Sequence, residues 1–494
     1  MKIKINFPTV SFKKLALITF ITCSSMQATM VIAKDNNKNK LPEIGTSAIS
    51  SLSLEKEKQI GDIMMRQLRA SQPVINDPVL TEYINHLGNK LVKNAHDVNY
   101  QFEFFLINQK EINAFAFFGG HVGIHSGLIT MADTESELAS VLAHEISHVT
   151  QRHLARRLES QSRNQPLAMT ALVSSVLLTL INPTVGFAAL STSMAASQQQ
   201  SINYTRGNEK EADRVGIALL ANSGFNPQGA PEFFNKLATQ YRYASKPPAM
   251  LLTHPLPNAR ITDAKARAQN YPFRPLAPSL EFELAKARIK ARYQDSAKDN
   301  IVFYQSQLNK KTYARQEAAL YGLAIAYFED KQFTKAKEIL LSLLEKDDKN
   351  LFYVDLLSDV YIQLKEFKPA ISMLEKLNLL MPNNQVVTLN YANVLTESGQ
   401  LEQAAELLQD FLLIKPDNFL AHDLLTTVYT KQKNSALMHM SKAEVYALLG
   451  AYPRAVDELQ TAYNYVEKDK PLLKKRIKAR ILQFQEQENK LKRL

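Results

Sequence analysis

The stretch VLAHEISHVTQRH, residues 141–153, places histidines and a glutamate inside a pattern that predicts an apolar helix. His144 and His148 are four residues apart, so they lie on one face of such a helix and their imidazoles can converge on a single ion. Glu145 follows His144 directly, where its carboxylate can act on a water at that ion without being a ligand. The spacing predicts the ligands and general base of a zinc hydrolase. The alternative is a helix with satisfied polar residues.

A catalytic zinc site needs a third protein ligand. One known spacing would place a glycine at Gln151 and a histidine at Leu154, so the sequence excludes it. His153 is one residue off that register, and we expect it on the solvent side. The later stretch NEKEADRVGIALL offers Glu209 as the third ligand and, four residues on, Asp213, which could orient a ligating histidine. The alternative is an amphipathic helix with solvent-exposed charges.

A small sheet is predicted before the histidine helix. Helices are expected near 54–71 and 77–95. The alternating apolar residues of YQFEFFLIN, residues 100–108, predict a strand, and NAFAFFGGHVGIHSGLI, residues 113–129, predicts two strands that pivot at a Gly-Gly pair. Helices combined with a small sheet predict an α+β fold.

One edge of that sheet is a candidate substrate site. An extended peptide could add a strand near 121–128, where His121, Gly123 and His125 share one side. The alternative is that these residues form a solvent-facing strand surface.

The stretch 166–197 is almost uncharged and is interrupted by Asn182-Pro183. Its unbroken apolar arm is too short to span a bilayer as a helix. We expect a helical hairpin or lid packed on the protein; the alternative is a segment that contacts a membrane or an apolar substrate.

Residues 281–494 read as helix after helix with an internal repeat. Alanine recurs every 34 residues at Ala336, Ala370 and Ala404, in a pattern that resembles the tetratricopeptide repeat. Helices can cross closely only where a side chain is small, which explains this column. The register slips after the third unit, and the basic stretch 470–494 is expected to form a solvated capping helix.

The N-terminus predicts a signal peptide over 1–33, followed by a polar linker over 34–50. The alternatives are a retained membrane anchor and, less favoured by the surrounding residues, lipidation of Cys23. Cys23 is the only cysteine of the chain, so cleavage would leave a protein without thiols, which suits an oxidising compartment such as a periplasm. A net charge of +11 without a basic, aromatic-interleaved motif gives no indication of nucleic-acid binding.

HEISH, the later EKEAD and the preceding NAFAFFGG together resemble the M48 zinc metallopeptidases, a gluzincin group. The resemblance implies a metallopeptidase domain over 51–275, one zinc ion bound by His144, His148 and Glu209, and Glu145 as the catalytic base. It leaves Asp213 either as a proton donor or, as we favour, as an orienting group.

LLTHPLPNAR, residues 251–260, places His254 before a proline, which keeps it outside a helix. Asn258 is expected to cap the following helix. The resemblance places His254 near the zinc, either as an oxyanion hydrogen-bond donor or as a fourth ligand that holds the enzyme latent. A loop histidine without a metal role is the alternative. Arg260 could assist His254 in its role at the zinc.

The resemblance also implies a function. We expect a periplasmic zinc endopeptidase that degrades misassembled or stalled outer-membrane barrel proteins and assists their assembly, its repeats docking clients or the barrel-assembly machinery. One alternative is a chaperone or adaptor with a latent protease centre. Another is a membrane-embedded M48 peptidase, which the lack of a convincing 20-residue span disfavours. Peripheral contact with a membrane remains open.

Overall fold

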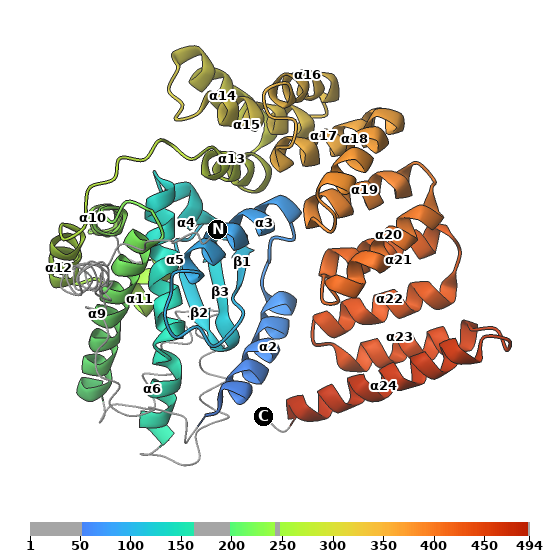
Figure 1. Ribbon diagram of the computed structural model, residues 1–494, viewed down its shortest axis with the longest axis horizontal. Helices are drawn as coiled ribbons and strands as arrows, with labels where there is room; N and C mark the ends of the chain where they lie inside the picture. Colours follow the sequence, from blue (N-terminus) through green and yellow to red (C-terminus); the bar gives the residue numbers. More distant parts are fainter. Residues whose placement is uncertain (1–51, 163–197, 243–247, 493–494) are drawn as a thin grey trace, which may run out of the picture. The chain divides into compact units, whose positions relative to one another are not determined.

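The computed structural model describes residues 52–162, 198–242 and 248–492, all of which belong to one compact unit (Figure 1). The predicted signal peptide, the polar linker and the apolar hairpin over 166–197 lie outside the described residues. Among the helices that the structure describes, none combines the length and apolar character that a bilayer crossing requires.

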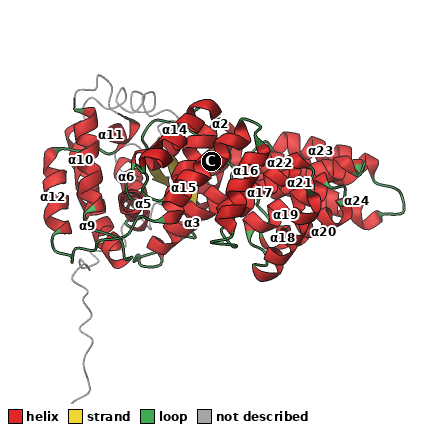
Figure 2. Ribbon diagram, turned by 90° about the horizontal axis from the view of Figure 1, so that it is seen from above, coloured by secondary structure: helices red, strands yellow, loops and turns green. Residues whose placement is uncertain are grey.

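The sheet has three strands in the order β1-β3-β2, and helices dominate the rest of the described chain (Figure 2). The strands are β1 (Glu103–Ile107), β2 (Ala114–Phe117) and β3 (His121–His125). β3 pairs parallel with β1 and antiparallel with β2. Gly119 and Gly120 have φ of 80° and 84° and form the pivot between β2 and β3 that the sequence predicts. The α+β fold class is confirmed.

Two expectations about β3 are wrong. It is the central strand, so its backbone is already paired on both sides and no substrate strand can add near 121–128. Its histidines are not solvent-facing either, since His121 and His125 are 6% and 7% exposed. Alternation along a strand identifies a face, but it does not reveal that helices cover both faces of the sheet.

The histidine helix is α5, and it packs against β2 on one side and α9 on another. Thr134 caps its N-terminus by accepting a hydrogen bond from the backbone N–H of Glu137. A Cβ at Gly216 would lie 3.1 Å from the backbone nitrogen of His144, so α9 approaches α5 closely because this residue is glycine. This part of the chain contains the helices α2 (Leu54–Ser71), α3 (Pro78–Val92), α4 (Ser126–Met131), α5 (Glu135–Thr150), α6 (His153–Ser162), α9 (Gln198–Asn222), α10 (Gly229–Tyr241), α11 (Ala249–Thr253) and α12 (Asn258–Ala268).

The expected capping role of Asn258 is also wrong. Asn258 is the first residue of α12, and the capping position is held by Pro257, which makes no side-chain cap hydrogen bond. Proline pre-sets an extended entry to a helix, so the helix begins one residue earlier than the capping pattern suggests.

The C-terminal region is a succession of antiparallel helices (Figure 1). Ala336, Ala370 and Ala404 are fully buried, as the 34-residue column predicts. The irregular part beyond the third unit remains helical, and α24 is the expected basic terminal helix. The helices are α13 (Leu280–Ile289), α14 (Ala297–Lys310), α15 (Gln316–Glu329), α16 (Phe333–Leu344), α17 (Leu351–Leu364), α18 (Phe367–Leu380), α19 (Gln385–Glu397), α20 (Leu401–Ile414), α21 (Phe419–Lys431), α22 (Ser435–Leu448), α23 (Tyr452–Tyr465) and α24 (Pro471–Lys492).

A buried ion cluster joins the helical region to the rest. Arg288 of α13 is 1% exposed and donates to Asp77 Oδ2 at 2.6 Å and to the Tyr321 hydroxyl at 2.8 Å. Its Nη2 lies 2.6 Å from Asp355 Oδ2 on α17. Asp77 in turn caps α3 through the backbone N–H groups of two residues of that helix. We call Asp77, Arg288, Tyr321 and Asp355 the Arg288 cluster.

Candidate metal centre

Three side chains from two helices converge beside the sheet. His144 Nε2 and His148 Nε2 on α5 are 3.0 Å apart. The carboxylate of Glu209 on α9 lies 3.4 Å from each of these nitrogens, one oxygen facing each. Zinc–nitrogen bonds of about 2.1 Å in a tetrahedral site separate neighbouring donor atoms by about 3.4 Å. The three side chains therefore fit the donor set of a single ion.

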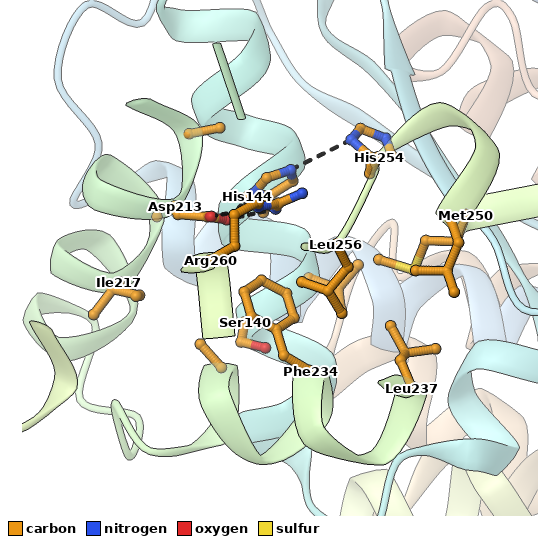
Figure 3. Close-up of a pocket in the computed structure, with 15 residues that line it drawn as sticks. Ser140, His144, Asp213, Ile217, Phe234, Leu237, Met250, His254, Leu256 and Arg260 are labelled. Atoms are coloured by element: carbon orange, nitrogen blue, oxygen red, sulfur yellow. Dashed lines mark hydrogen bonds and ion pairs between the residues drawn. The ribbon is translucent and has the colours of Figure 1, made fainter. Parts of the chain in front are cut away.

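His254, the residue after α11, joins this set (Figure 3). Its Nδ1 lies 3.4 Å from His144 Nε2 and 3.2 Å from both oxygens of Glu209. Its Nε2 lies 3.5 Å from Glu145 Oε1. One donor atom each from His144, His148, Glu209 and His254 fall within 4.8 Å of one another, the one such group found in the described part of the chain.

Glu145 is 1% exposed and lies beside the donor set without belonging to it. Within the described residues, its Oε1 has no hydrogen-bond partner. His254 Nε2 lies 3.5 Å from the same oxygen, at ion-pair distance. A buried carboxylate oxygen that accepts no hydrogen bond is available to a proton on a substrate or water.

Asp213, one turn after Glu209, contacts His144 from the outside. Its Oδ1 lies 3.0 Å from His144 Nδ1, the ring nitrogen that faces away from the donor set. Arg260 of α12 donates to both oxygens of Asp213, at 2.7 and 2.8 Å, and its Nη1 lies 2.8 Å from Glu209 Oε2. A carboxylate held in this way fixes the tautomer and orientation of a ligating histidine.

Comparison with known proteins gives this arrangement a family. The description Peptidase family M48 matches residues 78–268, and tetratricopeptide repeats match 318–350 and 361–428. The beta-barrel assembly-enhancing protease of Yersinia pestis is 44% identical over 85% of this chain and 87% of its own. That of Escherichia coli strain K12 is 42% identical over 92% and 93%. The Escherichia coli metalloprotease LoiP is 30% identical over 32% and 58%.

This chain belongs to peptidase family M48. It is accordingly a metalloendopeptidase followed by tetratricopeptide repeats, and the predicted family is confirmed. A metal is implied by the family, and the His-His-Glu-His group of the M48 peptidase is suited to hold one ion. Imidazole nitrogens with one carboxylate form the donor chemistry that zinc prefers.

The ionisable groups of this site shift one another's pKa values. Burial alone would lower the pKa of His144, but its hydrogen bonds to Asp213 and Glu209 outweigh burial and raise the pKa to about 10. Burial lowers the pKa of His148 to about 3, the charges of His144 and His153 lower it further, and Glu209 only partly opposes them. Burial opposes ionisation of Glu209 too, yet the charge of His254 and hydrogen bonds from His144 and His148 hold its pKa well below the usual value.

Asp213 is held ionised. Burial would raise its pKa, but hydrogen bonds from His144 and Arg260 outweigh burial and lower it. Both oxygens already accept hydrogen bonds from Arg260. A carboxylate with a lowered pKa and occupied oxygens is better suited to orient His144 than to donate a proton.

His153 is not on the solvent side, so that expectation is wrong. It is 4% exposed, its Nδ1 lies 2.9 Å from His148 Nδ1, and its Nε2 lies 3.0 Å from Glu211 Oε2. The sequence did not predict a role for Glu211, the middle acid of EKEAD. His153 and Glu211 lie near the two motifs in the sequence, but their positions relative to His148 and Glu209 do not indicate that they contact each other.

A mostly apolar pocket lies beside His144 (Figure 3). Arg260 borders it, but its guanidinium is occupied by Asp213 and Glu209. The pocket thus offers apolar surface next to the donor set. Its apolar lining includes Ile217, Phe234, Leu237, Met250, Leu251 and Leu256.

Proposed function

We propose that this chain is a zinc-dependent endopeptidase of the periplasm that degrades misassembled or stalled outer-membrane barrel proteins and assists their assembly through its repeats. The observation that carries the catalytic part is the convergence of His144, His148 and Glu209 at 3.0–3.4 Å. The substrate class is supported by relatives named beta-barrel assembly-enhancing protease, which match most of the chain. The location follows from that substrate class.

Each residue has a separate task in the proposed reaction. A zinc ion at this site would polarise the scissile carbonyl and lower the pKa of the attacking water. Glu145, whose Oε1 accepts no hydrogen bond, would accept the proton of that water and pass it to the leaving amine. Asp213 and Arg260 hold His144 and Glu209 in position.

His254 has two candidate roles. As an oxyanion donor it would contribute on the order of 3 kcal/mol to the transition state. As a fourth ligand it would keep the enzyme latent until a substrate displaces it. Its Nδ1, 3.2 Å from both oxygens of Glu209, favours the second role in the conformation described here.

The substrate chain requires a free strand edge. Among the strands that the structure describes, β3 is central, β1 and β2 form the two edges, and β2 packs against α5. We propose that an extended substrate pairs with the outer edge of β2. Backbone hydrogen bonds between the substrate and β2 would hold it near the donor set.

Substitution of Glu145 by Gln tests the reaction. The amide keeps the shape and the ligands but cannot accept the proton, so cleavage of a denatured barrel protein falls by about 100- to 10,000-fold. Glu402→Gln, an exposed change on α20, serves as the control with unchanged cleavage. Turnover like that of the unsubstituted protein in Glu145→Gln, with zinc still bound, would remove Glu145 from the reaction.

The repeats favour a second function, that of an adaptor. The Glu145→Gln protein separates the two functions. An adaptor keeps its effect on barrel assembly after this substitution, whereas a protease loses its effect on misassembled clients.

A further inference from the structure

We infer that His153, Glu211 and Arg156 form a second positioning arm for the metal centre, acting through His148; the inference rests on the proposed zinc site. We call these three residues the His153 arm. Its role corresponds to that of Asp213 and Arg260, which act through the other histidine, His144.

The direction of each ring follows from the distances. His148 Nε2 faces the donor set, 3.0 Å from His144 Nε2 and 3.4 Å from Glu209 Oε1. Its other nitrogen, Nδ1, lies 2.9 Å from Nδ1 of His153. Two ring nitrogens at this distance share one hydrogen, so one nitrogen donates and the other accepts.

The far side of His153 decides which one donates. Its Nε2 lies 3.0 Å from Glu211 Oε2, and an ionised carboxylate only accepts. His153 therefore carries its hydrogen on Nε2 and presents a lone pair at Nδ1. His148 must then donate from Nδ1, which leaves the lone pair of its Nε2 directed at the donor set. That is the tautomer a zinc ligand requires.

Glu211 is itself held in place. Arg156 of α6 donates from Nη2 to Glu211 Oε2 at 2.7 Å. Arg156 and His153 both lie on α6, whereas Glu211 lies on α9, so the arm also ties these two helices together. The contacts therefore run from Arg156 to Glu211, from Glu211 to His153, and from His153 to the ligand His148.

The backbone is bent to make this contact. In a continuous helix, His153 would lie about 140° around the axis from His148, facing elsewhere. Instead α5 ends at Thr150, and Arg152 takes a left-handed φ of 50° before α6 begins at His153. Arg152 is held there by a salt bridge with Glu57 of α2. A non-glycine residue at positive φ costs energy, so the bend persists because its surroundings stabilise it.

Zinc affinity of the full chain tests the arm. His153→Phe keeps a planar aromatic ring but removes the acceptor, so zinc affinity, measured by competition with a chromogenic chelator, is expected to fall about 10- to 100-fold. The absorption spectrum of the Co²⁺-substituted protein is expected to shift, because His148 no longer holds one orientation. His153→Gln, which retains an acceptor and a donor, is expected to recover part of the affinity.

His125→Phe is the matched control, because His125 is also a buried histidine of this region but is not among the contacts of the donor set. It is expected to leave zinc affinity and the Co²⁺ spectrum unchanged. Glu211→Gln leaves His153 in place and is expected to weaken zinc binding by several-fold; it decides the matter if His153→Phe does not fold.

The inference is overturned, with the proposed function intact, if His153→Phe has unchanged zinc affinity and an unchanged Co²⁺ spectrum. If His153→Phe does not fold, unchanged zinc affinity in Glu211→Gln has the same meaning. A wild-type protein that binds no zinc would overturn the proposed function and this inference together.

Discussion

The metal centre and the Arg288 cluster both bury charge, yet they differ in what faces the middle. In the Arg288 cluster a guanidinium lies between Asp77 and Asp355, so hydrogen-bond donors meet acceptors. In the metal centre, lone pairs of His144, His148 and Glu209 converge on one another. The first arrangement pairs a cation with acids of the chain, whereas the second gathers several metal-ligating atoms around one point.

This difference distinguishes a structural ion cluster from a binding site better than the burial of the residues does. Arg288 is 1% exposed and Glu209 is 3% exposed, so both are equally withdrawn from water. The pKa of Arg288 is raised well above its usual value, because its acidic partners outweigh burial. Charge complementarity inside a cluster stabilises a contact between elements, whereas converging acceptors create a binding site.

The largest effect on stability is expected for Arg288→Met. The substitution leaves Asp77 and Asp355 buried without their cationic partner, which lowers the free energy of unfolding by about 3–5 kcal/mol. Urea unfolding followed by circular dichroism measures the change, and zinc binding by the folded protein should be retained.

Arg480→Met is the control for this prediction. Arg480 pairs with Glu444 at 2.6 Å but is 44% exposed, so its loss should cost less than about 1 kcal/mol. Equal effects of the two substitutions would mean that the Arg288 cluster holds nothing together.

A smaller effect, of a different kind, is expected for Asp213→Asn. The amide does not carry the charge that holds His144 and Arg260, so zinc affinity falls by about 10- to 100-fold, as measured by chelator competition. A stability loss with unaltered zinc affinity would instead place Asp213 with the structural ion pairs.

The smallest effect is expected for His121, whose partners Asp62 and Glu103 are 51% and 38% exposed. Burial would lower the pKa of His121, but hydrogen bonds to both acids raise it above 6.5. Burial would raise the pKa of Glu103, but His121 and Arg69 lower it from 4.5 to about 2.

The sign of the pH effect follows from these directions. The charged histidine adds stability below pH 6.5, and this is lost as the pH rises through its raised pKa. The ionised glutamate adds stability above pH 4.5, and this is lost as the pH falls towards 2. The difference in melting temperature between wild type and His121→Gln should therefore be larger near about pH 5.5 than near about pH 8.5. A difference in melting temperature that does not change with pH would show that His121 contributes only packing.

Much of the fold was predictable because its signals are local. Periodicity identifies α2, α3 and the three strands, and the 34-residue alanine column identifies the repeats. The meeting of His144 with Glu209 was predictable for another reason: H-E-x-x-H demands a third ligand, and NEKEAD offers Glu209 with Asp213 four residues on.

The sequence by itself determined which side chains have the chemistry of a metal site, since ligand type and helical spacing are properties of the chain. Only the tertiary structure decided that β3 is central, that Arg260 binds Glu209 and Asp213 of α9, and that the bend at Arg152 brings His153 to His148. These contacts join residues whose separation along the chain follows no period, so no local pattern encodes them. They are set by how close α5, α9 and α12 pack, which depends on the whole fold.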